Sequence, residues 1–322
     1  MVGLDWVKGA LVLAMVFYHW MNYFVGPDSE AYRYVRFVTP SFIFLTGFLV
    51  SHIYLPRVIA GERGVRRRLA WRGLKLLGIV FALNGIIHAW GTRLTPARMQ
   101  PGNSSREVLA HLAGFSPMAF SVLVPIAYFL ILSAGLIACF IHFRRIFHIV
   151  AAVLSALALA AEWMGIQSGY LDMLSFGMLG ASIGHLSTET INTLSRQHPK
   201  LALAYFVHLY ALATWNTLLP LQFVSVILNL LLLYRIGELS AAGRIADTFH
   251  RLGEYSLLAY ISQIAILQLL RHSLHLSGMS GLPAAYAALF ACAAILISFL
   301  AVVDLARRQV PAFARLYGAV FA

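Results

Sequence analysis

Charged side chains are scarce in this sequence. Asp, Glu, Lys and Arg make up 11% of the 322 residues, whereas hydrophobic residues make up 60%. A mean hydropathy of +0.78 is far too high for a soluble globular chain of this length, so lipid must be the solvent. No polar block exceeds about thirty residues, which leaves no room for an appended soluble domain. We therefore expect one membrane domain over residues 1–322.

Cysteine is almost absent. Cys139 and Cys292 are the two cysteines, and both fall inside apolar runs. They are interpreted as packed thiols, and a disulfide framework is excluded. The histidines and cysteines also lack the local spacing of a strong metal site, so no metal is expected.

Acidic residues are half as frequent as basic ones, 12 against 24, which gives a formal net charge of +12. Such a charge could indicate nucleic-acid binding, but the distribution argues against it. The basic residues occupy short loops, and alternate assignment of these loops puts eighteen of the 24 on one side. The positive-inside rule then places both termini in the cytoplasm and requires an even number of spans.

The apolar runs are unbroken and near the length that a helix needs to cross hydrocarbon, which favours an all-α bundle over a barrel. Asp5 and the lack of a cleavage pattern after His19 favour a retained first span over a signal peptide. Residues 92–118 form the longest predicted outer loop and could cover the mouth of a cavity. We expect a polytopic bundle of about ten spans, near residues 6–25, 37–55, 73–91, 119–140, 147–164, 170–186, 201–216, 218–234, 254–270 and 283–303.

The first predicted span carries Asp5, Lys8 and His19. Ionisable groups on such a helix are costly and usually face a bundle interior or a cavity. Lys8 and His19 are eleven residues apart, so on a helix they lie within about 20° of the same face and on the order of 16 Å apart along the axis. An anionic donor bound beside Lys8 at the cytoplasmic mouth could therefore extend towards His19.

Histidine is the natural general base at neutral pH, and His19 could deprotonate an acceptor hydroxyl or amine for attack on a thioester. The alternative is a packed or hydrogen-bonded helix contact, which is common for a lone histidine in a membrane. The alignment with Lys8 favours the catalytic interpretation.

A dense basic segment lies between the second and third runs. A topological role is sufficient to explain it, because cytoplasmic loops are basic. Capture of the phosphates of coenzyme A is the functional alternative, because Arg forks bind phosphates bidentately. The candidate residues are Arg66, Arg67, Arg68, Arg72 and Lys75.

Several further polar residues are predicted at membrane depth, and three of them are candidates for the site. His88 is at a depth similar to that of His19, with Asn84 one turn below it, and could orient the acceptor or His19. An interhelical hydrogen bond explains His88 at least as well. Gln263 is assigned mainly to packing, with an acceptor contact as the alternative.

Several segments resemble the acyltransferase family 3 membrane proteins. Lys8 stands where that family has an Arg, which is followed by ten residues and then a catalytic His, and Gln263 stands at the His of a late Gly-x-x-Ser…Tyr…His segment. Residues 39–42 and 72–77 are closer to the related heparan-α-glucosaminide N-acetyltransferase-like proteins. The segments that carry the family 3 resemblance are 5–9, 18–19, 42–49 and 252–263.

The resemblance implies an acyl-CoA-dependent O- or N-acyltransferase with His19 as its catalytic residue. Acyl-CoA, above all acetyl-CoA, would be a cytoplasmic co-substrate, and no bound cofactor is implied. The acceptor would be a carbohydrate or glycolipid across the membrane, here expected to be the inner (plasma) membrane of a bacterium. The expected partners are these two substrates and membrane lipids, and no nucleic acid.

Two other functions are compatible with the composition. A transporter or flippase should show paired, broken helices in two halves, and we find none in the sequence. A non-catalytic relative acting as a membrane scaffold stays open, because Lys8 lacks the planar fork of Arg and Gln263 cannot act as a base.

Overall fold

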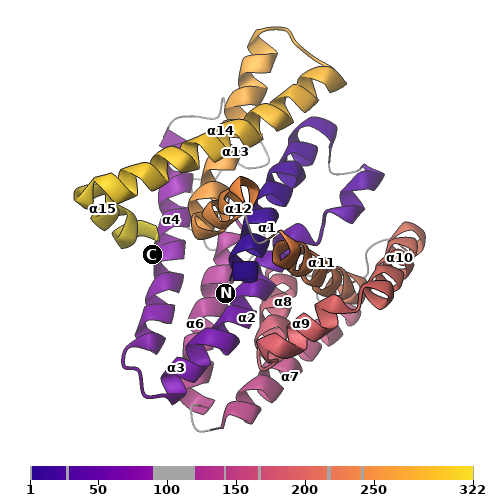
Figure 1. The fold of residues 1–322 in the computed structure, drawn as a ribbon, viewed down its shortest axis with the longest axis vertical. Helices are drawn as coiled ribbons and strands as arrows, with labels where there is room; N and C mark the ends of the chain where they lie inside the picture. The colour runs from indigo at the N-terminus through magenta and orange to yellow at the C-terminus, as the bar shows by residue number, and fades with distance from the viewer. Residues whose placement is uncertain are drawn as a thin grey trace. The chain divides into compact units, whose positions relative to one another are not determined.

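The computed structural model describes residues 2–26, 29–89, 120–140, 143–165, 168–215, 219–240 and 243–321. The regular elements of these residues are all helices, without a strand (Figure 1). This confirms the all-α prediction. Seven helical segments in the described chain are long and apolar enough to cross a membrane: Glu30–Ile59, Val65–Ile86, Leu123–Phe140, Arg145–Trp163, Leu219–Leu239, Ser256–Leu276 and Leu282–Gln309.

The finer topology stays a prediction. The expected spans 6–25, 170–186 and 201–216 fall on helices α1 (Val2–Trp20), α8 (Gly169–Ile183) and α10 (His198–Trp215). These three are helical but are not among the seven segments found in the described chain. The count of about ten spans and the cytoplasmic termini therefore await a test, and the predicted outer loop 92–118 lies outside the described residues.

The chain divides into two compact units. Unit 1 comprises Met1–Val38 and Ile191–Ala322, and unit 2 comprises Thr39–Thr190. The prediction of one acyltransferase domain over residues 1–322 concerns their joint function and stays a prediction.

Helix α1 is the central element of unit 1. Its neighbours are α11 (Leu219–Leu239), α12 (Arg244–Glu254), α13 (Ser256–Leu276) and α14 (Leu282–Gln309). Leu11, Val12 and Met15 are almost completely buried, so α1 packs against helices on most of its circumference. The apolar side of α1 is therefore enclosed by helices, whereas Asp5 and Lys8 near its start are partly exposed.

Glycines allow α1 and α12 to cross closely. A Cβ added at Gly9 would clash with the carbonyl oxygen of Phe249, and one added at Gly253 would clash with the carbonyl oxygen of Asp5. Next to this crossing, the rings of Trp6 and Phe249 stack at 4.5 Å. Small residues therefore bring the two backbones into contact beside Lys8.

Unit 1 also contains α10, which packs against α11, and four shorter elements. The shorter elements are η1 (Met21–Val25), η2 (Glu30–Tyr34), α9 (Thr188–Arg196, which begins in unit 2) and α15 (Pro311–Phe321). Arg33 of η2 donates to the carbonyl oxygens of Leu212 and Ala213 in the last turns of α10. This arginine therefore binds the exposed carbonyls at a helix C-terminus.

Unit 2 contains α2 (Val38–Leu49), η3 (Val50–Tyr54), α3 (Leu55–Ile59), α4 (Val65–Ala89), α6 (Leu123–Phe140), α7 (Arg144–Trp163) and α8. Helix α4 packs on α6, and α7 packs on α8. A Cβ at Gly47 would clash with the carbonyl oxygen of Gly177, and one at Gly180 with that of Phe44. The glycines at these two positions therefore permit close packing of the helices.

The basic segment is helical rather than a loop. Helix α4 begins at Val65, whereas the sequence analysis placed the start of the third span at residue 73. Gly64 has a φ of +81°, which suits a turn directly before the helix. Val65 and Leu69 are buried on one side of this first part of α4. Arginine is also a good helix former, so the basic residues extend the helix beyond the apolar run.

Candidate active site

His19 lies in the last turn of α1, directly before the π-helical turn η1. Single π-helical turns occur frequently at functional sites. The Nε2 atom of His19 is shielded from solvent and has no hydrogen-bond partner among the described residues. Because an unpaired buried polar atom costs free energy, this nitrogen marks a position where a ligand can supply the missing partner.

Three tyrosine rings surround the His19 imidazole. The ring centroids of Tyr23 and Tyr260 each lie 6.0 Å from that of His19, and that of Tyr18 lies at 5.4 Å. Tyr260 comes from α13 and is buried. In the described part of the chain no carboxylate forms an ion pair with His19. Ring contacts, and not an acidic partner, therefore position this imidazole.

Further polar groups adjoin the tyrosines. The hydroxyl of Tyr32 donates to that of Tyr18, and the guanidinium of Arg36 lies 5.6 Å from the centre of the Tyr32 ring. The Arg36 guanidinium is thus connected to the surroundings of His19 through Tyr32 and Tyr18.

Gln263 is a further group of unit 1 with buried atoms that lack a partner in the described chain, as do Trp6 at Nε1 and His208 at Nδ1. Its side chain is completely buried, and neither amide atom has a hydrogen-bond partner among the described residues. Gln263 follows Tyr260 by three residues on α13, so both side chains point to the same side of that helix. A buried amide without partners is costly unless a ligand satisfies it. This geometry favours the acceptor contact over simple packing.

Lys8 and Asp5 form an ion pair near the start of α1, with 2.8 Å between Nζ and Oδ1. The helix is continuous from Val2 to Trp20, so the predicted common stripe of Lys8 and His19 lies on one regular helix. Asp5 thus pairs with the expected donor-side charge, at the opposite end of α1 from His19.

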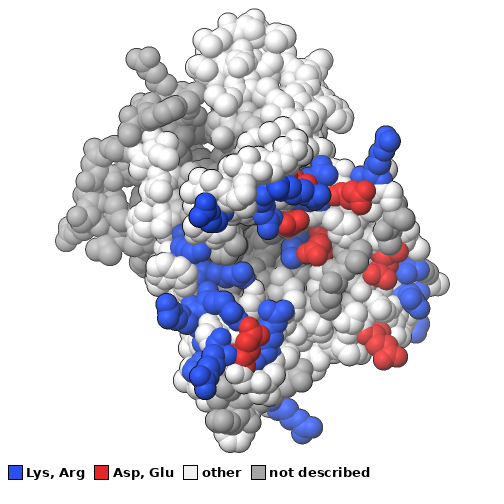
Figure 2. Space-filling view, turned by 60° about the vertical axis from the view of Figure 1, so that its left-hand side comes forward, with Lys and Arg blue, Asp and Glu red and all other residues white. Residues whose placement is uncertain are grey.

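The arginines of α4 present cations in unit 2. Arg66 and Arg67 are exposed, while Arg68 donates to Glu62 and Arg72 donates to the hydroxyl of Tyr54. Lys75 is half-buried on the same helix. Figure 2 shows that exposed Lys and Arg side chains outnumber Asp and Glu on the face in view. Exposed guanidinium groups at this density can accommodate phosphates.

Asn84 and His88 lie on α4 of unit 2, whereas His19 belongs to unit 1. The Asn84 amide donates to the carbonyl of Val80 at 2.9 Å, one turn back, which is a packing contact within α4. The side chain of His88 lies outside the described residues.

Another membrane histidine provides a contrast. The Nε2 atom of His208 on α10 lies 2.6 Å from the hydroxyl oxygen of Ser225 on α11, and both residues are buried. His208 is therefore a hydrogen-bonded packing histidine. His19 has no such partner among the described residues.

Tyr18, Tyr260 and Arg36 are not assigned to the site from the sequence. Tyr23 is assigned from the sequence mainly to the aromatic belt at the outer ends of the spans, with a sugar-stacking platform as the alternative. It follows His19 by four residues and so shares a helix face with it. Tyr260 comes to His19 only because α13 packs on α1. Comparisons with protein-family models, curated proteins and solved structures find no match to this chain.

Proposed function

We propose that this chain is a membrane-embedded acyltransferase. It moves an acyl group, above all acetyl, from cytoplasmic acyl-CoA to a hydroxyl or amine of a carbohydrate or glycolipid acceptor across the membrane. The supporting observation is the buried, unpartnered Nε2 atom of His19 on the helix that also carries Lys8. A base that must take a proton from a substrate needs this nitrogen available.

In the proposed reaction, the Nε2 atom of His19 takes the proton of the acceptor O–H or N–H while the acceptor oxygen or nitrogen attacks the thioester carbonyl carbon. A new C–O or C–N bond forms, the C–S bond breaks, and coenzyme A leaves with the proton as its free thiol. The rings of Tyr23 and Tyr260 contact the imidazole and hold its orientation during this step.

The two substrates would contact different residues. For the donor, Lys8 in unit 1 and, separately, the exposed arginines of α4 in unit 2 each suit phosphates such as those of coenzyme A. On the acceptor side, the tyrosine rings suit stacking on a sugar, and the Gln263 amide can donate to and accept from its hydroxyls.

The test measures release of coenzyme A thiol from acetyl-CoA by the purified chain, together with acetyl-CoA affinity. We expect His19→Ala to lower kcat by roughly 10² to 10⁴ without weakening acetyl-CoA binding, because a general base acts on the transition state.

His208→Ala is the matched control. It removes the hydrogen bond to Ser225 and should lower thermal stability while leaving kcat close to wild type. A folded His19→Ala protein that works at the wild-type rate would show that His19 is not the base. Absence of both acetyl-CoA binding and turnover in the wild type would instead favour a transporter or a scaffold.

A further inference from the structure

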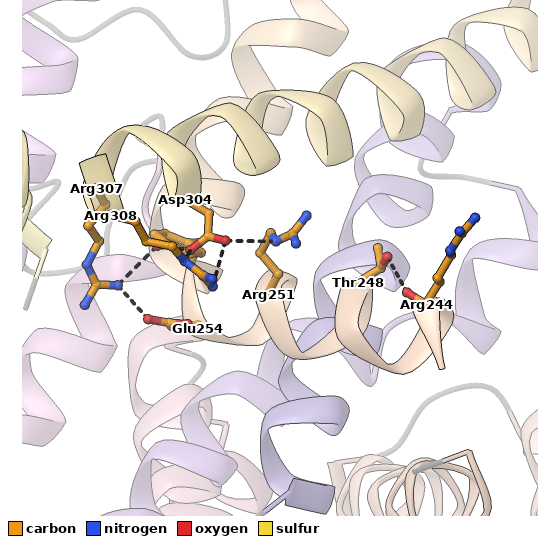
Figure 3. Close-up of polar contacts among 8 residues, drawn as sticks. Arg244, Thr248, Arg251, Glu254, Asp304, Arg307 and Arg308 are labelled. Carbon is orange, nitrogen blue, oxygen red and sulfur yellow. Dashed lines mark hydrogen bonds and ion pairs between the residues drawn. The ribbon is translucent and has the colours of Figure 1, made fainter. Parts of the chain in front are cut away.

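A polar cluster joins α12 and α14 in unit 1 (Figure 3). Asp304 is buried and accepts a hydrogen bond from the Tyr255 hydroxyl at 3.0 Å. Two arginines form ion pairs with the same carboxylate, Arg251 at 3.4 Å and Arg308 at 3.0 Å. Asp304 therefore ties the amphipathic helix α12 to the end of α14.

Arg307 links this cluster to α15. It donates to Glu254 and to the Tyr255 hydroxyl, and its guanidinium lies 5.6 Å from the Tyr255 ring and 5.2 Å from the Tyr317 ring. The rings of Tyr255 and Tyr317 meet edge to face at 5.3 Å. One face of α15 is thus held against the unit through Tyr317.

The ion pairs leave a positive surplus. Three guanidinium groups, those of Arg251, Arg307 and Arg308, face two carboxylates, those of Glu254 and Asp304. The Arg308 side chain is 73% exposed although it pairs with Asp304. Arg315 on α15 is exposed and forms no ion pair within the described residues.

Apolar side chains are exposed beside these cations. Val302 and Leu305 lie on the last turns of α14, Val310 lies between the helices, and Leu316 lies on α15. Leu316 is 62% exposed and Val302 is 65% exposed. Because α14 is one of the membrane-spanning candidates, this apolar surface continues the surface that lipid chains cover.

From this combination we infer that the junction of α14 and α15 is a binding site for an anionic phospholipid. The headgroup phosphate binds Arg308 and Arg315, and the acyl chains cover Val302, Leu305 and Leu316. A surplus of guanidinium charge beside exposed apolar groups matches a ligand that is anionic at its head and apolar in its tails. This site is independent of the proposed acyl transfer.

The test uses native mass spectrometry of the full chain in detergent, with dioleoyl phosphatidylglycerol as the anionic probe and dioleoyl phosphatidylcholine as the zwitterionic one. We expect the wild type to bind phosphatidylglycerol more tightly. Arg315→Gln should weaken phosphatidylglycerol binding on the order of fivefold, the effect of about one surface cation, and leave phosphatidylcholine binding unchanged. Arg315→Lys keeps the charge and should retain most of the affinity.

Arg63→Gln is the matched control, since it removes one exposed cation from unit 2. Arg315 carries no ion pair among the described residues, so its replacement does not disturb the Asp304 cluster. Equal binding of the two lipids by the wild type would overturn the inference, as would an equal loss in Arg63→Gln. Weaker acetyl-CoA binding in Arg315→Gln, with phosphatidylglycerol binding intact, would reassign the site to the donor and also overturn it.

Discussion

Hydrogen-bond partners separate the roles of residues of the same type in this protein. His208 shares a hydrogen bond with the hydroxyl of Ser225. The Asn229 amide donates to the backbone carbonyl of Ser225 at 2.9 Å. The Nε2 atom of His19 and both amide atoms of Gln263 are also shielded from solvent, but they have no hydrogen-bond partner in the described chain. A missing partner does not identify a site by itself, because Trp6 Nε1 and His208 Nδ1 are also buried without one in the described chain. His19 differs from His208 in that its Nε2 atom forms no hydrogen bond to another helix among the described residues.

Gln263→Leu distinguishes a ligand contact from a packing role. The substitution removes an unpaired buried amide, so we expect the free energy of unfolding to stay equal or rise by about 1–3 kcal/mol. If Gln263 contacts the acceptor, KM for the acceptor should rise roughly threefold to tenfold, the loss of about one hydrogen bond. Thermal unfolding and acceptor saturation curves measure the two effects.

Asn229→Leu serves as the control for this substitution, because it removes an amide that is hydrogen-bonded to Ser225. It should lower the unfolding temperature and leave the acceptor KM unchanged. A marked loss of stability in Gln263→Leu would show that its amide has a structural role.

At the scale of elements, α1 connects the expected donor end to the candidate base. Its regular helix carries Lys8 near one end and His19 at the other, and the crossing with α12 fixes its position beside Lys8. The glycines at that crossing are therefore requirements of packing, not of backbone conformation.

Gly253→Ala should weaken this crossing. The new Cβ would clash with the carbonyl oxygen of Asp5, and backbone cannot move aside as a flexible side chain can. We expect the free energy of unfolding to fall by about 1–3 kcal/mol, as is typical for overpacking, and thermal unfolding in detergent measures it.

Gly78→Ala provides the comparison on α4, because no atom would lie within 4 Å of its Cβ. Alanine is the better helix former, so this variant should be as stable as the wild type or more stable by up to about 1 kcal/mol. Equal stability of the two variants would contradict the close α1–α12 packing.

At the scale of the whole molecule, the distribution of basic residues predicts the orientation in the membrane. Eighteen of the 24 Lys and Arg lie on the side assigned to the cytoplasm. The free cysteines Cys139 and Cys292 are replaced first, and single cysteines are then introduced as Arg63→Cys and Arg271→Cys. An impermeant thiol reagent should label position 271 from outside and position 63 only after permeabilisation. The reverse labelling pattern would show that the protein has the opposite orientation, with residue 63 outside.

The sequence by itself determined the properties that reside in single helices. Hydropathy over long windows predicts the all-α membrane class, and the eleven-residue offset of Lys8 and His19 depends only on helical periodicity. Helix α4 also extends ahead of the apolar run near 73–91, because the basic residues from Arg66 onwards are good helix formers but are not apolar.

The tertiary structure alone decided which faces meet. Three contacts join residues that are distant in the sequence and lie on different helices. They are the ring contact of Tyr260 with His19, the close backbone approach of Gly253 to Asp5, and the ion pair of Arg251 with Asp304. Local patterns define an apolar face but do not specify its partner, since many apolar faces pack equally well against one another in lipid. The lack of a hydrogen-bond partner at His19 and Gln263 likewise becomes visible only once every neighbouring helix is in place.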